Sequence, residues 1–246
     1  MKTYKLKEAC FLGDSITDGV GVNKGERYFD LIAEKLGIKT YGYGVNGAQF
    51  IGLKEQIKRM KSERGENVDA IFVFAGTNDY NGGVPVGEWF SETQETVVAE
   101  REENGAPKRY ETRKKRVFDF DESTFCGRIN TVLSLLKRDY AEKEIILITP
   151  IHRAFAEFGP SNIQYDERYS NSIGEYLDAY VDAVRKGADL WSVRLIDAYR
   201  DSGLFPLTDE SAKAYFANFD TDRLHPGKVG HERLAELVGR YIINNL

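Results

Sequence analysis

The stretch Phe11-Leu12-Gly13-Asp14-Ser15-Ile16-Thr17-Asp18-Gly19 decides the fold, because a short apolar run breaks there into a polar loop that begins with glycine. Short apolar runs bounded by turn residues are typical of buried strands. Ligands of open α/β sheets bind in the crevice beyond the carboxyl ends of the strands, and this pattern puts Ser15 there. A plain strand-to-helix turn, with Asp14 or Ser15 as the helix cap, would explain the same residues. Residues far downstream decide between the two interpretations.

The rest of the chain alternates apolar runs with stripes of helical spacing. The expected strands are Glu8–Leu12, Lys39–Val45, Asp69–Ala75, Glu144–Pro150 and Val193–Asp197. The helical stripes between and after them lie in Tyr28–Leu36, Leu53–Met60, Phe125–Leu136, Leu177–Val184 and Leu234–Ile242. Five strands separated by helices predict an α/β fold, a three-layer sandwich around a five-stranded parallel sheet.

Length and composition fit one globular domain. The 246 residues contain no linker rich in Pro, Ser or Gly, so we expect a single domain over residues 1–246. The net charge of −5 argues against a nucleic-acid binder. No apolar stretch reaches transmembrane length and no signal peptide is visible, so we expect no membrane insertion and a cytoplasmic protein, or a secreted one if a leader has been removed. Cys10 and Cys126 are too few and too far apart for a disulfide framework or a zinc site, and we expect two buried thiols and no bound metal.

An insertion at about residues 80–121 interrupts the α/β order. Val97-Val98 and Val117-Phe118 flank Asn104-Gly105, the strongest short turn signal, which predicts a β-hairpin that projects from the body. Its basic run Arg113–Arg116 is balanced by glutamates on the other strand, so a solvated arm is the first interpretation. A subunit contact in a homo-oligomer and a wall of the substrate cleft are the alternatives.

The three histidines differ in their surroundings. His231 lies in the final helix, where a surface or packing role is usual, and His152 follows a strand but has no acid nearby in sequence, although it could line the pocket. His225 follows Asp222 by three residues in an expected loop, with Pro226 suited to the first turn of the closing helix. A carboxylate bonded to Nδ1 would leave Nε2 free to face a serine, which needs such a base because its hydroxyl is a weak nucleophile. A turn aspartate beside a chance histidine is the alternative.

Acyl transfer also needs hydrogen-bond donors for the oxygen that becomes negative in the tetrahedral intermediate. Asn78 ends the third expected strand, Gly47 follows the second, and the backbone N–H of Ser15 follows the first. Each could equally be a turn residue. Together they are stronger evidence for a set of donors at one site, because a parallel sheet brings the ends of these strands to one edge.

Four short stretches of this sequence resemble the conserved motifs of the SGNH hydrolases, also called GDSL-type esterases and lipases. Gly13-Asp14-Ser15-Ile16 resembles the first motif with Ile in place of Leu, and Gly42–Gly47 resembles the second with Gly42 where Asn is common. Gly76-Thr77-Asn78-Asp79 and Asp222–Pro226 are similar to the third and the fifth. The resemblance implies a flavodoxin-like SGNH fold, Ser15 as nucleophile, His225 as base, Asp222 as orienting acid, an oxyanion hole of Ser15, Gly47 and Asn78, and no cofactor. The glycine at position 42 leaves the bracing of its loop to be explained.

The expected activity is that of a serine esterase acting on a small-molecule ester, with a small acyl group such as acetyl on a carbohydrate or another polar alcohol. The side chains expected near the pocket are Asp14, Tyr80, Asn81, Trp89, His152 and Arg153. Tyr80 or Trp89 could instead pack under the arm.

Several other activities would use the same residues. An acyltransferase acting on sugars, a thioesterase and a lysophospholipase are alternatives with the same site. A flavodoxin-like module that binds a nucleotide is an alternative of another class, although the charges of Asp14 and Asp18 in the first loop would oppose a phosphate.

Overall fold

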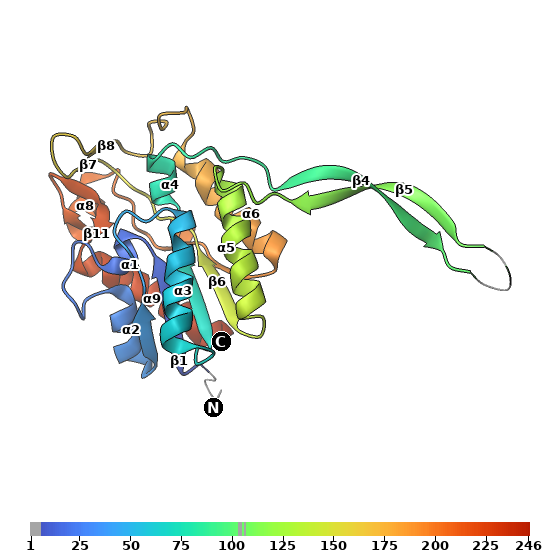
Figure 1. Cartoon of the computed structure of the whole chain (residues 1–246). Coiled ribbons are helices and arrows are strands. Elements are labelled where there is room, and N and C mark those ends of the chain that lie inside the picture. The colour runs from blue at the N-terminus through green and yellow to red at the C-terminus, as the bar shows by residue number, and fades with distance from the viewer. Residues whose placement is uncertain (1–5, 103–104, 106) are drawn as a thin grey trace.

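A five-stranded parallel sheet forms the centre of the computed structural model, which describes residues 6–102, 105 and 107–246 (Figure 1). The strand order is β2-β1-β3-β6-β9, and every neighbouring pair is parallel. The bounds are β1 Glu8–Gly13, β2 Lys39–Gly42, β3 Ala70–Phe74, β6 Glu144–Ile148 and β9 Arg194–Ile196. This sheet confirms the predicted fold class. The second strand ends three residues earlier than the sequence predicts, although Tyr43 and Val45 still donate backbone hydrogen bonds to β1.

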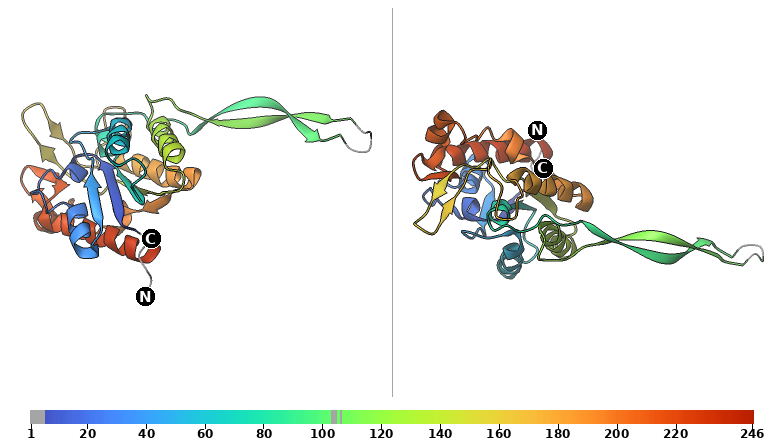
Figure 2. Two further views of the ribbon diagram at one scale, coloured as in Figure 1. Left: turned by 60° about the horizontal axis from the view of Figure 1, so that its bottom comes forward. Right: turned by 90° about the horizontal axis from the view of Figure 1, so that it is seen from above.

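Helices cover both faces of the sheet (Figure 2). One face carries α3, α5 and α6, and the other carries α2 and α9. The bounds are α2 Tyr28–Leu36, α3 Leu53–Arg64, α5 Phe125–Asp139, α6 Leu177–Trp191 and α9 Lys228–Asn245. The shorter helices are α1 Ser15–Asp18, a 3₁₀ turn Phe50–Gly52, α4 Thr77–Asn81, α7 Ala198–Asp201 and α8 Asp209–Tyr215. Among the helices of the described residues, none is both long and apolar enough to cross a membrane.

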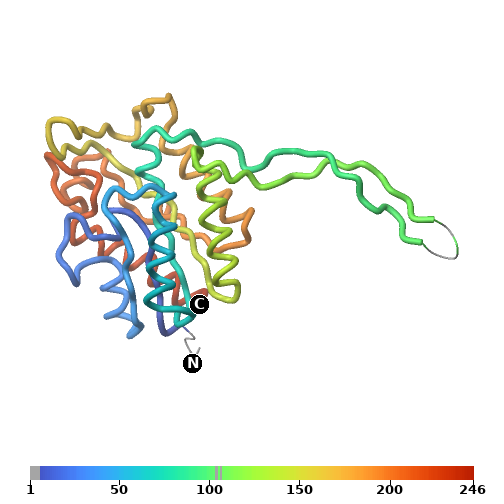
Figure 3. Tube along the Cα trace, viewed as in Figure 1, coloured from blue at the N-terminus to red at the C-terminus, as the bar shows by residue number. Residues whose placement is uncertain are grey.

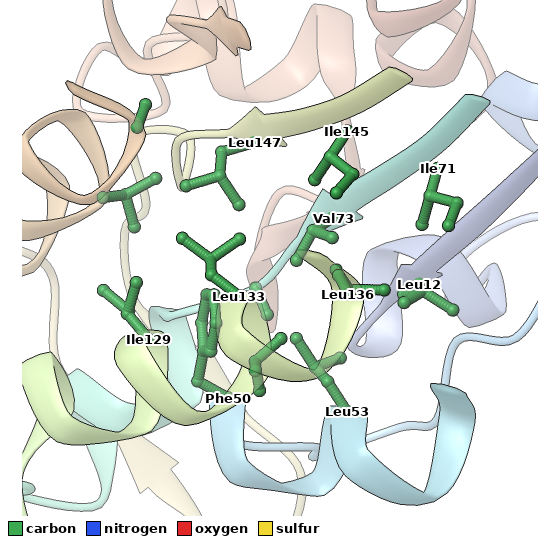
Figure 4. Packing of buried hydrophobic residues seen from close by; sticks show 14 of the residues in the cluster. Leu12, Phe50, Leu53, Ile71, Val73, Ile129, Leu133, Leu136, Ile145 and Leu147 are labelled. Carbon is green, nitrogen blue, oxygen red and sulfur yellow. The ribbon is translucent and has the colours of Figure 1, made fainter. Parts of the chain in front are cut away.

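The core has two halves because successive side chains of a buried strand point to opposite faces. Phe11 and Phe72 stack with ring centroids 4.7 Å apart on the side of α2 and α9. Leu12 and Val73 point to the other side, where they face Leu136 of α5 (Figure 4). Covering on both faces explains why these strands are continuous apolar runs in the sequence.

A small second sheet lies beside the carboxyl edge of the first, and the sequence did not predict it. Its order is β10-β11-β7-β8, with bounds β7 Ala156–Glu157, β8 Ile163–Gln164, β10 Phe216–Asn218 and β11 Asp222–Pro226. The segment from Asp222, expected in a loop, is therefore a strand. Pro226 is the last residue of β11 and lies before α9, whose N-cap is Gly227, so the expectation that Pro226 opens the helix is wrong.

The inserted segment forms the predicted hairpin of β4 Phe90–Glu100 and β5 Arg109–Phe118, which projects from the body as a long arm (Figure 3). Asn104 of the predicted Asn104-Gly105 turn lies outside the described residues. Asn130 of α5 holds the root of the arm, because its buried amide donates to the carbonyls of Trp89 and Asp119 at 3.1 and 2.7 Å. In all three views the arm leaves on the side of α5 and α6, opposite to β7 and β8 (Figures 1 and 2).

Candidate active site

The site lies where the order of the strands changes direction. From β1 the chain first adds β2 on one side and then places β3 on the other, so β1 and β3 flank the topological switch point. Ligands bind at this point in open α/β sheets. Ser15 follows β1, Gly47 follows β2 and Asn78 follows β3, so the topology brings three predicted site residues to one edge.

Local hydrogen bonds fix the turn that presents Ser15. Ser15 is the first residue of α1, and the Asp14 side chain caps this helix by accepting the Ile16 N–H at 3.0 Å. On the other side, the Gln56 amide bonds both the N–H and the carbonyl of Gly13, at 2.8 and 2.7 Å. Gly13 must lack a Cβ, since that atom would lie 2.5 Å from the Phe74 carbonyl oxygen. The turn is therefore clamped directly before the serine.

The structure brings Ser15, His225 and Asp222 into one line of hydrogen bonds. His225 Nε2 lies 2.9 Å from Ser15 Oγ, and Nδ1 lies 2.8 Å from Asp222 Oδ2. An ionised carboxylate only accepts, so Nδ1 donates to Asp222 and Nε2 is left as the acceptor for the serine hydroxyl. Ser15 and His225 are each only 4% exposed. A buried hydroxyl and imidazole, followed by a half-buried carboxylate, can move a proton from the serine to the imidazole.

Backbone hydrogen bonds hold the carboxylate of Asp222 in place. Its Oδ1 accepts the N–H groups of Leu224 and His225 at 3.1 and 3.0 Å, which leaves Oδ2 for the imidazole. The chain of β11 is fixed in turn, because the Arg223 N–H donates to the Phe155 carbonyl at 3.0 Å. The ring of Phe158 lies 5.4 Å from that of His225, between centroids, and contributes to the wall of the cavity.

The three residues predicted to supply oxyanion donors, Ser15, Gly47 and Asn78, all line one cavity. The Asn78 amide donates one hydrogen to the Ala48 carbonyl at 3.1 Å, and its second hydrogen remains for a ligand. Gly47 has φ of +75°, a conformation that favours glycine, and both Gly47 and Asn78 line the cavity at Ser15. The Ser15 N–H is at the first turn of α1, where a helix leaves N–H groups without helical partners.

The loop that carries Gly47 is held in place by Asp79, Arg128 and Gln49, for which the sequence predicted no role. Asp79 accepts the Phe50 N–H at 2.8 Å with one oxygen and bonds Arg128 at 2.8 Å with the other. Arg128 also donates to the Gln49 side chain at 3.0 Å. The glycine at position 42 has a separate reason, since a Cβ there would lie 2.3 Å from the Phe29 ring, and an asparagine would not fit.

Asp14 directly precedes Ser15, and its carboxyl group is buried, with the residue only 2% exposed. Burial raises the pKa of Asp14 to about 7, although the Ile16 N–H and the nearby His225 oppose the shift. Its role in the geometry is to cap α1. It is not among the described residues that line the cavity at Ser15.

Two neighbouring cavities open at this edge of the sheet. We call Ser15, His225 and Asp222 the triad, and the cavity at Ser15 the triad cavity. This cavity has a volume of about 220 Å³ and is lined by Ser15, Val20, Asn46, Gly47, Asn78, Phe158, Asn162, Gln164, Leu224 and His225. A second cavity, about 420 Å³, shares Asn162 and Gln164 with it and includes Tyr80 and Asn81. Tyr80 and Asn81 therefore lie near the triad, but in this second cavity.

Three other residues predicted near the pocket, Arg153, His152 and Trp89, do not line either cavity. Arg153 is 1% exposed and donates to the Gln164 side chain at 2.7 Å, so it lies behind the shared wall. His152 bonds Glu167 at 2.6 Å, an acid fifteen residues downstream that sequence spacing did not reveal. Trp89 packs at the root of the arm, where its ring would contact a Cβ on Gly187 at 3.1 Å.

The remaining histidine has a packing role. His231 is the fourth residue of α9 and fully buried, and its Nδ1 accepts the Tyr28 N–H at 3.1 Å. Cys10 and Cys126 are buried free thiols, and burial raises the pKa of each to about 12. Within the described ranges, no group of three or more His, Cys, Asp and Glu side chains could hold a metal ion.

Fold and geometry together define a three-layer α/β protein with a hydroxyl, an imidazole and a carboxylate in line at the carboxyl edge of its sheet. Residues 11–233 match the GDSL-like lipase/acylhydrolase family, and the chain belongs to this family. The family indicates a hydrolase that acts on esters. No curated protein sequence matches the chain.

Solved structures share the SGNH hydrolase fold. A protein from Lactobacillus plantarum is 23% identical with a TM-score of 0.73, and the match covers 98% of each chain. A possible lipase from Chitinophaga pinensis is 21% identical with a TM-score of 0.67, over 96% of this chain and 97% of the other. A mutant of an acetyl-xylooligosaccharide esterase from a Geobacillus species is 18% identical with a TM-score of 0.57, over 98% and 96%. At these identities the likeness establishes the fold.

Proposed function

We propose that the protein is a serine esterase that removes a small acyl group, such as acetyl, from a carbohydrate or another polar alcohol. The observation that carries the proposal is the hydrogen-bonded line from Ser15 Oγ through His225 to Asp222, at 2.9 and 2.8 Å. Nucleophile, base and orienting acid lie in the order that acyl transfer needs. Membership of an acylhydrolase family supports the same reaction class.

In the first step Ser15 Oγ attacks the ester carbonyl while His225 Nε2 takes the hydroxyl proton. The carbonyl oxygen becomes negative, and the Asn78 amide with the N–H groups of Gly47 and Ser15 stabilises it. The imidazolium then gives its proton to the alcohol oxygen, the carbon–oxygen bond breaks, and the alcohol leaves. Asp222 keeps Nδ1 protonated and stabilises the imidazolium.

In the second step a water molecule attacks the acyl-enzyme. His225 takes a proton from this water as a second tetrahedral intermediate forms. The bond to Ser15 Oγ then breaks as the imidazolium gives this proton to Oγ, which releases the acid and the free Ser15 hydroxyl. All of these proton transfers run through the one imidazole, so the reaction requires no further base.

The cavity at Ser15 supports a small acyl group. Its volume of about 220 Å³ is below the roughly 300–1,000 Å³ of pockets that hold drug-sized ligands. None of its described lining residues is Lys or Arg, so the lining offers no permanently cationic side chain for the phosphate of a nucleotide. The lining therefore favours the esterase over the nucleotide-binding alternative.

Hydrolysis of p-nitrophenyl acetate by wild type, Ser15→Ala and Asp222→Asn tests the proposal. We expect kcat to fall by about 10⁴-fold or more in Ser15→Ala, and by about 10⁴-fold in Asp222→Asn, which leaves the imidazole in the wrong tautomer. Ser91→Ala, on the exposed arm, is the matched control and keeps wild-type rates. Undiminished hydrolysis by a folded Ser15→Ala protein would remove this serine from the mechanism.

An acyltransferase is the second candidate, because the adjoining second cavity is polar enough to hold a sugar acceptor. A sugar that binds there could attack the acyl-enzyme in place of water. The ratio of acylated sugar to free acid, measured with rising concentrations of sugar, separates transfer from hydrolysis.

A further inference from the structure

The second cavity lies directly across a shared wall from the triad. Asn162 and Gln164, from the β7–β8 hairpin, line both cavities. The second cavity is also bounded by Tyr80 and Asn81 at the end of α4, the same short helix that contains Asn78. A ligand that spans the wall would therefore have one end at the oxyanion donors and the other in the second cavity.

The chemistry of the second lining is polar and uncharged. Its described residues carry hydroxyl, amide, phenol or aliphatic groups, and none is Asp, Glu, Lys, Arg or His: Tyr80, Asn81, Ser161, Asn162, Ile163, Gln164, Tyr165, Ser170, Asn171 and Ser172. A phosphorylated or carboxylated alcohol would call for a cationic partner. A long alkyl chain would call for a mainly apolar wall. A neutral polyol, with many hydroxyls and small apolar faces, matches amides, hydroxyls and tyrosine rings.

Gln164 is held in one orientation at the wall. Its Oε1 accepts from Arg153 Nη2 at 2.7 Å, so the amide nitrogen is directed away from Arg153. One of the two amide hydrogens goes to Asn162 Oδ1 at 3.2 Å, and the second remains for a ligand. Without Arg153 the amide could turn and present either its oxygen or its nitrogen.

Arg153 is itself fixed from several sides. Besides Gln164, its guanidinium donates to Thr77 Oγ1 at 3.3 Å and lies 5.4 Å from the centroid of the Tyr80 ring. Both of these guanidinium hydrogen bonds go to neutral oxygens, and burial lowers the pKa of Arg153 to about 10. Burying a cation on neutral oxygens costs stability. The same contacts connect Thr77 of α4, the helix that carries Asn78, to Gln164 at the shared wall.

We propose that the second cavity binds the alcohol part of the ester, that this alcohol is a neutral polyol such as a sugar unit, and that Gln164 donates a hydrogen bond to it. Arg153 is then the positioning residue that sets the Gln164 amide. The acyl group would occupy the smaller triad cavity and the ester oxygen would lie at the shared wall. This inference rests on the proposed esterase function.

Kinetics with two kinds of ester test the subsite. p-Nitrophenyl acetate has no polyol, whereas an acetylated xylooligosaccharide does. In Gln164→Leu we expect kcat/KM for the saccharide to fall about tenfold to hundredfold, mainly through KM, and by at least tenfold more than kcat/KM for p-nitrophenyl acetate. Gln94→Leu, the same change on the exposed arm, is the control and leaves the ratio of the two constants unchanged.

Asn81→Ala, at another lining residue of the second cavity, provides a second variant in case Gln164→Leu does not fold. It should shift the same ratio in the same direction. The unacetylated oligosaccharide provides a measurement that needs no turnover of a sugar ester: it should inhibit p-nitrophenyl acetate hydrolysis competitively in wild type, and about tenfold more weakly in either variant.

The outcomes separate the two proposals. If wild type hydrolyses p-nitrophenyl acetate but not the acetylated saccharide, or if both folded variants keep the wild-type ratio, the subsite is wrong and the esterase stands. If Ser15→Ala hydrolyses p-nitrophenyl acetate as fast as wild type, the esterase proposal fails and the subsite fails with it.

Discussion

In the proposed mechanism the side-chain amide of Asn78 has one structural hydrogen bond and one to the substrate. The Ala48 carbonyl accepts one amide hydrogen and orients the group, and the other hydrogen would bind the negative oxygen. The neighbouring Asp79 fixes the loop that carries Gly47 by accepting the Phe50 N–H. Donors held in this way cost no reorganisation when charge develops on the substrate.

Asn78→Ala should therefore lower kcat for p-nitrophenyl acetate by about 10²-fold to 10³-fold, the usual effect of one lost oxyanion donor. KM should change much less, because the donor acts mainly in the transition state. Asn67→Ala, at the amino-terminal edge of the sheet, is the matched control. A kcat within twofold of wild type would exclude Asn78 from the oxyanion hole.

Single residues differ in how well the sequence reveals them. Ser15 and His225 are found because each stands in a short motif after an expected strand or before the last helix. The contact of Gly42 with the Phe29 ring, and the pairing of His152 with Glu167, depend on distances across the fold. No spacing along the chain encodes those distances, so the sequence could not predict them.

The strand β11 shows the same limit for elements. It carries both Asp222 and His225, and it is held by β7 and β10, yet its partners contribute only two or three residues each. Such short strands give no period-2 pattern to recognise. In the main sheet, β1, β3 and β6 have five or six residues and are mainly apolar, so their sequences predict strands. The strands β2 and β9 have only four and three residues, and they were predicted because each lies within a longer stretch, Lys39–Val45 and Val193–Asp197.

The arm lies apart from both cavities of the site. Its strands pair mainly with each other, and none of its described residues lines the triad cavity or the second cavity. Ser91 and Val117 are cross-strand partners, so replacing residues 92–116 by Asn-Gly should close a two-residue hairpin at the root. We expect the shortened protein to fold and to keep kcat/KM for p-nitrophenyl acetate within about twofold. A loss of activity above tenfold in the folded protein would mean that the arm contributes to catalysis.

A homo-oligomer formed through the arm stays a prediction. An isolated two-stranded ribbon is at best marginally stable in water, which gives a physical reason to expect a partner. Light scattering on the wild-type and shortened proteins tests it. Wild type should have twice the mass of the chain or more, and the shortened protein should be monomeric. Equal association states would place the contact elsewhere or exclude it.

At the scale of the whole molecule, His231 links the first long helix to the last. Its Nδ1 accepts the Tyr28 N–H across 203 residues of chain, and its ring stacks on that of Tyr28 with centroids 6.1 Å apart. Burial lowers the pKa of His231 to about 4, since a charged imidazole would lose its hydration there. The neutral ring is therefore part of the folded structure.

This shift makes stability depend on pH. Between about pH 6.5 and 4 the unfolded chain binds a proton at His231 and the folded chain does not, so the free energy of unfolding falls as the pH falls. From pH 7 to 4.5 this group should contribute a loss of about 2 kcal/mol. His231→Asn keeps an acceptor for the Tyr28 N–H without the titration, and urea unfolding at both pH values should show a correspondingly smaller loss. Parallel losses in the two proteins would show that His231 does not titrate in this way.

The whole account depends on folding having activated one hydroxyl among all the serines of the chain. Treatment with a p-nitrophenyl alkylphosphonate, followed by peptide mass spectrometry, measures this directly. We predict one covalent adduct per chain, located on Ser15, with loss of esterase activity in proportion to labelling and almost no labelling in His225→Ala. Full labelling at another residue, or equally fast labelling of Ser15 without His225, would contradict the account.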